Sequence, residues 1–76
     1  MSFQGYLNSI EKSTGKTPAD FRGWAEDREF LNEGRLRSDV KVTEVVDALK
    51  QDFGLGRGHA MAIVALLKGT KNEGDA

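Results

Sequence analysis

The segment VVDALKQDFGLGRGHAMAIVALLKG, residues 45–69, decides the fold of this chain. Apolar residues recur at helical spacing on both sides of a glycine-containing stretch, GLGRGHA, at residues 54–60. Because glycine adopts backbone conformations that other residues avoid, this stretch is suited to a tight turn. The pattern therefore predicts two helices, at about residues 42–53 and 57–68, joined by a hairpin turn.

The apolar residues near the N-terminus predict another helix. Their spacing places four side chains on one helix face: Phe3, Tyr6, Leu7 and Ile10. Ser2 is a suitable residue to cap the start of this helix, and Gly15 is a suitable residue to end it.

A further helix start follows that turn. Thr17 supplies a capping hydroxyl, Pro18 occupies the first helical position, and Asp20 lies three residues after the cap. The apolar residues expected to point inward from this helix are Phe21, Trp24, Ala25 and Leu31. We expect the helix to fray near residues 32–34.

The remaining segments are polar. Residues 32–40, NEGRLRSDV, are interpreted as a connector that places Leu36 against the core, and no alternation of apolar and polar residues lasts long enough to predict a strand. Residues 70–76 are predicted to form a flexible, disordered C-terminal tail after a single helical domain at residues 1–69. The predicted fold class is all-α, with four short helices in two helix-turn-helix units around one core. The residues expected in that core are Phe21, Trp24, Leu49, Phe53, Ile63 and Val64.

Composition narrows the function classes. The chain has 76 residues, no cysteine, one histidine and a formal net charge of −1, so disulfides and thiolate zinc sites are excluded and no metal site is expected. No apolar run is long enough to span a membrane, and the first residues do not resemble a secretory signal. We therefore expect a cytoplasmic protein with no membrane partner. Because a core this small provides little stability, self-association is a further possible support.

No constellation of residues predicts catalysis or a cofactor. The sequence TGKT at residues 14–17 ends like a P-loop, but Ile10 stands where that motif needs glycine, and the preceding segment is helical. His59 lacks an orienting partner and a nucleophile in the sequence. The carboxylate pairs Glu11/Asp20 and Asp47/Asp52 are interpreted as solvated helix faces rather than as a glycosidase pair. We expect no catalytic residue and no enzyme activity.

The stretch GLGRGHA resembles the helix-hairpin-helix motif, in which a glycine–hydrophobic–glycine hairpin is followed four residues later by a small alanine, here Ala60. The resemblance implies that backbone amides at the start of the second helix face a nucleic-acid phosphate. Helix N-termini favour anions for general reasons, and such contacts do not depend on base sequence. The candidate phosphate- or anion-binding residues are Gly56, Arg57, Gly58, His59 and Lys16.

Some features favour this interpretation and others oppose it. The chain carries no acidic residue between positions 53 and 72, and GKTPA at residues 15–19 echoes GRGHA at residues 56–60. The proline that often accompanies the hairpin is absent, and Gly58 weakens the helix start by about 1 kcal/mol relative to alanine. The alternative interpretation is a purely structural turn, in which Ala60 is small so that two helices approach closely.

A second resemblance covers about residues 3–69. The chain is similar to a small bacterial family of uncharacterised domains with a T-G-K turn and a late G-L-G-x-G-H-A block. The matching positions are Tyr6, Ile10, Thr14, Gly15, Lys16, Leu49, Lys50, Gly54, Leu55, Gly56, Gly58, His59 and Ala60. The chain departs from the family at Ala48, where a tryptophan is frequent, and in its longer connector. The resemblance implies a fold unit but no activity.

These observations predict a non-enzymatic binding or interaction module of a bacterial cytoplasmic protein, with a protein partner or a second copy of itself. The alternative is weak, non-specific nucleic-acid binding through the turn at residues 54–60. The sequence pI of about 5.7 favours the first of these.

Overall fold

Four helices and one short β-hairpin make up residues 3–70, which are the part of the chain that this computed structural model describes. In chain order the elements are α1 (Phe3–Thr14), α2 (Pro18–Asp27), β1 (Leu31–Asn32), β2 (Arg35–Leu36), α3 (Val42–Phe53) and α4 (Arg57–Lys68). The prediction of four helices around one core is confirmed. The predicted Ser2 cap lies outside the described residues.

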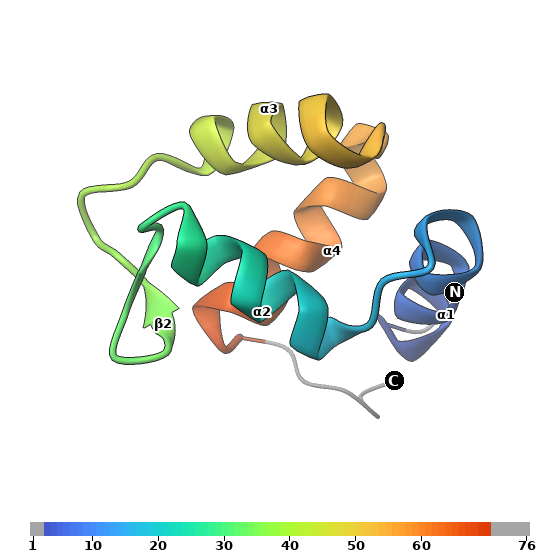
Figure 1. Ribbon diagram of the computed structural model, residues 1–76, viewed down its shortest axis with the longest axis horizontal. Coiled ribbons are helices and arrows are strands. Elements are labelled where there is room, and N and C mark those ends of the chain that lie inside the picture. The colour runs from blue at the N-terminus through green and yellow to red at the C-terminus, as the bar shows by residue number, and fades with distance from the viewer. Residues whose placement is uncertain (1–2, 71–76) are drawn as a thin grey trace.

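Helix α4 lies at the centre of the fold. It packs against α1, α2, α3 and β2, and Figure 1 shows it running beneath α3 and behind α2. Its buried residues occupy more than one helix face: Ala60, Ala62, Ile63, Val64, Leu66 and Leu67. A helix that is apolar on several faces is stable only when other elements surround it. The other three helices provide that cover.

The predicted core residues fall into two groups. Phe21, Leu49, Ile63 and Val64 are buried, as predicted. Trp24 and Phe53 are only half-buried and pack against the edge of the core. The Phe53 ring lies edge-on to Phe21 at 5.0 Å and to Trp24 at 5.5 Å between ring centroids.

The turn between α1 and α2 has the geometry that the sequence predicts. Gly15 has a left-handed backbone with φ of 73°, and its N–H donates to the Glu11 carbonyl at 2.7 Å. The Asp20 N–H donates to the Thr17 hydroxyl at 3.3 Å, and the Thr17 N–H donates to the Asp20 carboxylate at 2.9 Å. This reciprocal capping box satisfies two N–H groups that a helix start otherwise leaves unpaired.

The prediction that α2 continues to residues 32–34 is wrong. The helix ends at Asp27, and Leu31 lies in β1 rather than on the inner face of α2. Glu29 adopts a left-handed backbone with φ of 62°, which lets the Phe30 N–H donate to the Ala25 carbonyl at 2.9 Å. This hydrogen-bond pattern closes a helix end, and glycine usually occupies the left-handed position. The helix end escaped prediction because glutamate occupies that position here.

The connector also contains strands that the sequence did not predict. Strands β1 and β2 pair antiparallel, with Leu31 opposite Leu36. The two residues between the strands, Glu33 and Gly34, have positive φ values of 54° and 80°, as a tight two-residue hairpin requires. Leu36 is half-buried and packs against the core, as expected.

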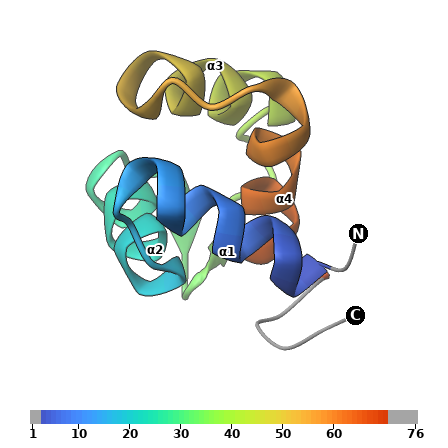
Figure 2. The same ribbon diagram turned by 90° about the vertical axis from the view of Figure 1, so that its right-hand side faces the viewer.

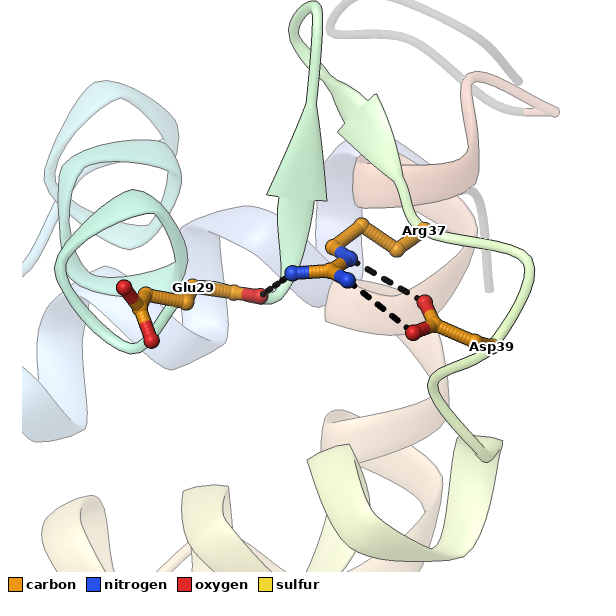
Figure 3. A network of polar contacts seen from close by, with 3 residues as sticks. All are labelled: Glu29, Arg37 and Asp39. Carbon is orange, nitrogen blue, oxygen red and sulfur yellow. Dashed lines mark hydrogen bonds and ion pairs between the residues drawn. The ribbon is translucent and has the colours of Figure 1, made fainter.

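Arg37 holds the hairpin against the end of α2. Its guanidinium donates two hydrogen bonds of 3.0 Å to the Asp39 carboxylate and one of 3.4 Å to the Glu29 carbonyl. Figure 3 shows this arrangement, in which one side chain joins the two ends of the connector. The Arg37 N–H also donates to the Phe30 carbonyl at 2.8 Å.

Helix α4 ends at Gly69, which has a left-handed backbone with φ of 78°. The Thr70 N–H and hydroxyl donate to the Ala65 carbonyl at 3.1 Å and 3.2 Å, so this residue closes the helix. The rest of the predicted tail, residues 71–76, lies outside the described residues.

A polar cluster on the surface joins α2 to α3. The Trp24 indole N–H donates to the Asp52 carboxylate at 2.8 Å, and Arg28 Nη2 donates to the same oxygen at 2.6 Å. The Arg28 guanidinium also lies 5.7 Å from the centre of the Trp24 ring. The indole hydrogen bond, and to a lesser degree Arg28, lower the pKa of Asp52 below its ordinary value of 3.8.

Replacing Ile63 with alanine is expected to cost about 2–5 kcal/mol of unfolding free energy, because it leaves a cavity beside the central helix. Ile63→Val, which removes one methylene, is expected to cost about 0.5–1.5 kcal/mol. Met61→Ala, on the same helix but 40% exposed, is expected to stay within about 0.5 kcal/mol of the parent. Urea unfolding measures all three, and equal losses at positions 61 and 63 would contradict the central position of α4.

The lowered pKa of Asp52 predicts acid sensitivity of a definite sign. Above pH 3.8, the ordinary pKa of an aspartate, the ionised Asp52 carboxylate stabilises the fold. This contribution to stability is lost as the pH falls through the lower pKa of Asp52 in the folded state. We expect the melting temperature to fall between pH 7 and pH 3, and to fall less in Asp52→Asn and in Trp24→Phe. Thermal unfolding followed by circular dichroism measures the difference. An unchanged pH dependence in both variants would show that the cluster does not stabilise the fold.

Candidate anion-binding hairpin

The turn between α3 and α4 is short because one residue reverses the chain and the next anchors it. Gly54 has a left-handed backbone with φ of 69°, and its N–H donates to the Lys50 carbonyl at 2.9 Å. Leu55 is buried, with 4% of its surface exposed. Gly56 has an extended backbone and caps α4, where the Ala60 N–H donates to its carbonyl at 2.9 Å. Residues 54–56 therefore reverse the chain, anchor the turn to the core through Leu55, and fix where α4 begins.

The first turn of α4 is open to a ligand. Its first N–H groups, on Arg57, Gly58 and His59, have no acceptor within the helix, as at every helix start. Gly56 provides no capping side chain, and the first turn contains no acidic residue. A Cβ atom built on Gly56 or Gly58 would meet no other atom within 4 Å, so packing within the described chain requires glycine at neither position. Both glycines are exposed, and neither has a side chain that would cover these N–H groups.

A hollow of about 320 Å³ lies beside this turn, between α3 and the start of α4. Its lining residues are Val46, Asp47, Lys50, Leu55, Gly56 and Arg57. Val46 and Leu55 are half-buried and buried, whereas the charged lining residues are exposed. The lining therefore combines an apolar base, Val46 and Leu55, with three exposed charged residues. These are the cations Lys50 and Arg57 and the carboxylate Asp47.

His59 is less available than its position suggests. It is half-buried, and its ring lies edge-on to the Tyr6 ring with 5.8 Å between centroids. Figure 2 shows α1, which carries Tyr6, crossing in front of α4. Tyr6 is 36% exposed, so the pair presents an aromatic edge beside the open helix start. The His59 side chain is therefore packed against Tyr6 and is not fully exposed to solvent.

The structure places Lys16 elsewhere. This exposed residue lies in the turn between α1 and α2, where its N–H donates to the Thr14 hydroxyl at 3.1 Å. It lines a second hollow with Trp24 and Phe53, and that hollow shares no residue with the one beside Arg57. Of the predicted anion-binding residues, Gly56, Arg57, Gly58 and His59 thus form one helix start, and Lys16 lies outside it. Among the five, Gly56 and Arg57 line the hollow beside this start. Anion binding at this start stays a prediction.

Two residues of this region escaped the sequence analysis of the site. Lys50 lies four residues, about one helical turn, before Gly54. This spacing places Lys50 in the last turn of α3, so its position near the hairpin could have been predicted from the sequence. Tyr6 contacts His59 from 53 positions earlier in the chain, and no local pattern indicates such a contact.

The carboxylates considered for catalysis have other surroundings. Asp20 accepts hydrogen bonds from the Thr17 backbone N–H and hydroxyl, which lower its pKa below 3.8 with a smaller contribution from Lys16. Asp52 is engaged by Trp24 and Arg28, and Asp47 lines the hairpin hollow. Within residues 3–70, no group of three or more histidine or acidic side chains is arranged to hold a metal ion. In that same range no helix has the length and apolar character to cross a membrane.

The chain belongs to the family described as Domain of unknown function (DUF4287), which matches residues 2–69. The predicted membership of a small family of domains of unknown function is therefore confirmed. Comparisons with curated proteins and with solved structures gave no match.

Alanine at Gly54 and at Gly58 is expected to change stability in opposite directions. Gly54→Ala forces a side chain into a left-handed backbone and should cost about 1–2 kcal/mol. Gly58→Ala meets no neighbour within 4 Å and should gain up to about 1 kcal/mol from better helix propensity. Urea unfolding of both variants measures the difference. A loss at Gly58 equal to that at Gly54 would show that Gly58 serves the fold itself.

Proposed function

We propose that this chain is a non-enzymatic binding module of a bacterial cytoplasmic protein, and that it contacts the phosphate backbone of nucleic acids through the α3–α4 hairpin. One observation carries the proposal. The start of α4 has no side-chain cap and no side chain at positions 56 and 58, and the cations Arg57 of α4 and Lys50 of α3 line the hollow beside it.

Phosphate is the ligand chemistry that suits this start best. The unpaired N–H groups of a first helical turn carry a partial positive charge that favours an anion. Arg57 adds a planar, permanently charged donor group, and Lys50 adds a second cation on the facing helix. The absence of Cβ atoms at Gly56 and Gly58 allows a bulky phosphate to approach the backbone closely. The resemblance of GLGRGHA to the helix-hairpin-helix motif supports the same interpretation.

The nature of the lining favours backbone contacts over base recognition. The hairpin hollow contains no aromatic side chain on which a base would stack. Cations and N–H groups contact phosphates without sequence preference. With two cations opposed by Asp47, and a chain of net charge −1, the affinity should be weak and strongly dependent on salt.

Titration of the ¹⁵N-labelled chain with a short DNA duplex at low salt tests the proposal. The amide signals of residues 55–60 and of Lys50 should shift most. Arg57→Gln and Lys50→Gln should each weaken binding, and each should reduce the slope of log affinity against log salt by about 1. The matched control is Lys41→Gln, which removes the same charge from the other end of α3 and should leave these amide shifts in place.

Two results would contradict the proposal. One is the absence of shifts at residues 55–60 at low salt. The other is an affinity loss in Lys41→Gln as large as that in Arg57→Gln, since this would indicate a diffuse attraction rather than a hairpin site.

A further inference from the structure

A second hollow, of about 380 Å³, lies between the α1–α2 turn, α2 and the end of α3. Its lining residues are Lys16, Ala19, Asp20, Gly23, Trp24, Asp27 and Phe53. We call it the Trp24 hollow. It shares no residue with the hairpin hollow, and its lining has the opposite charge balance, with two carboxylates and one cation.

Aromatic side chains form the apolar part of the Trp24 hollow. Trp24 and Phe53 are half-buried, and their rings meet edge-on at 5.5 Å. Both rings therefore keep part of their surface in contact with solvent in a concave position. Such a surface recognises groups with a flat or apolar body.

Gly23 keeps this hollow open. It lies in the middle of α2 with ordinary helical backbone, where glycine is less favourable than alanine. A Cβ atom at this position would meet nothing within 4 Å, so neither the backbone nor the packing of the described chain requires glycine there. The effect of Gly23 is to leave space beside Trp24 that any side chain would fill.

Both carboxylates at the edge of the hollow, Asp20 and Asp27, are exposed. Asp27 is exposed, and its carboxylate makes no hydrogen bond or ion pair with the side chains of residues 3–70. Asp20 is held in place by Thr17, and these hydrogen bonds lower its pKa. Lys16 lies near Asp20 and is the single cation in the lining. Asp27 is therefore the carboxylate that is available to an incoming cation.

The same indole already holds a cation of the chain itself. The Arg28 guanidinium lies 5.7 Å from the centre of the Trp24 ring and donates to the Asp52 carboxylate at 2.6 Å. Guanidinium groups combine well with an aromatic ring and a carboxylate because they are flat, weakly hydrated and rich in donors. In the hollow, Trp24 and Phe53 provide aromatic rings and Asp27 provides a carboxylate, which are the same kinds of partner for a second guanidinium group.

We propose that the Trp24 hollow binds an arginine side chain of a partner protein, with the guanidinium against Trp24 and Phe53 and hydrogen-bonded to Asp27. The aliphatic part of that side chain would cross the space above Gly23. The two carboxylates of the lining favour a basic protein segment and repel a phosphate backbone. This inference is independent of the nucleic-acid proposal, because the two hollows have no residue in common.

Titration with the blocked tripeptide acetyl-Gly-Arg-Gly-amide tests the inference directly. The chain contains one tryptophan, so its fluorescence and its indole N–H resonance both come from Trp24, which lines this hollow. We expect a saturable shift of both signals at millimolar peptide. The same peptide with citrulline, which is neutral and nearly the same shape, should give no saturable shift.

Variants separate the hollow from the rest of the surface. Asp27→Asn should weaken peptide binding about 1.5- to 5-fold, as expected for an exposed ion pair. Glu26→Gln, which removes a neighbouring exposed carboxylate outside the hollow, should leave binding unchanged.

Gly23→Leu should fill the hollow and abolish binding, whereas Gly58→Ala, outside this hollow, should not affect binding. Gly23→Ala should raise the melting temperature by about 4–8 °C, which verifies that a side chain at this position is compatible with the fold.

Several outcomes would overturn the inference. They are a citrulline peptide that shifts the indole signal as strongly as the arginine peptide, binding that persists in Gly23→Leu, and an equal loss in Glu26→Gln and Asp27→Asn. A lysine peptide that binds as well as the arginine peptide would overturn the assignment of a guanidinium.

Discussion

The burial of α4 on several faces is the constraint on which the rest of the structure depends. Residues such as Ile63 and Val64 need cover from different directions, and α1, α2 and α3 supply it. Apart from Met61, the exposed residues of α4 lie in its first turn and at its last residue. Its first N–H groups have no partner inside the helix, so burying them would be costly, and the start of α4 lies at the surface. The packing of the core thus leads to the feature from which we infer anion binding.

The end of α3 separates two surfaces of different chemistry. Lys50 lines the hairpin hollow with Arg57, whereas Phe53, three residues later, lines the Trp24 hollow with Asp27. In a chain this small, one helix end therefore takes part in two concave sites. One lining has two cations and one carboxylate, and the other has two carboxylates and one cation, a difference that underlies the two separate proposals. Under the two proposals, the chain would contact a nucleic acid at one surface and a basic protein segment at the other.

The parts of the fold that the sequence predicted well are those with local physical causes. The turn at Gly15 and the capping box of Thr17 and Asp20 involve residues a few positions apart, so their spacing is visible in the sequence. The early end of α2 was missed because Glu29 takes a left-handed conformation that glycine usually signals. The short β-hairpin was missed for a related reason, since Glu33 also has positive φ. The hydrogen bond from Arg37 to the Glu29 carbonyl and the packing of Leu31 and Leu36 against the core hold this segment in place.

The sequence by itself determined the presence of four helices, the capping box of Thr17 and Asp20, and the glycine turn before α4, because hydrogen bonds and backbone preferences within a few residues govern these features. Only the tertiary structure decided which candidate site residues lie together. Lys16 was grouped with Arg57 on charge, yet it lines a hollow with Trp24 and Phe53 instead. Trp24 meets Asp52 across 28 positions, and Tyr6 meets His59 across 53. Such contacts depend on how the helices pack around α4, and no spacing in the sequence encodes that packing directly.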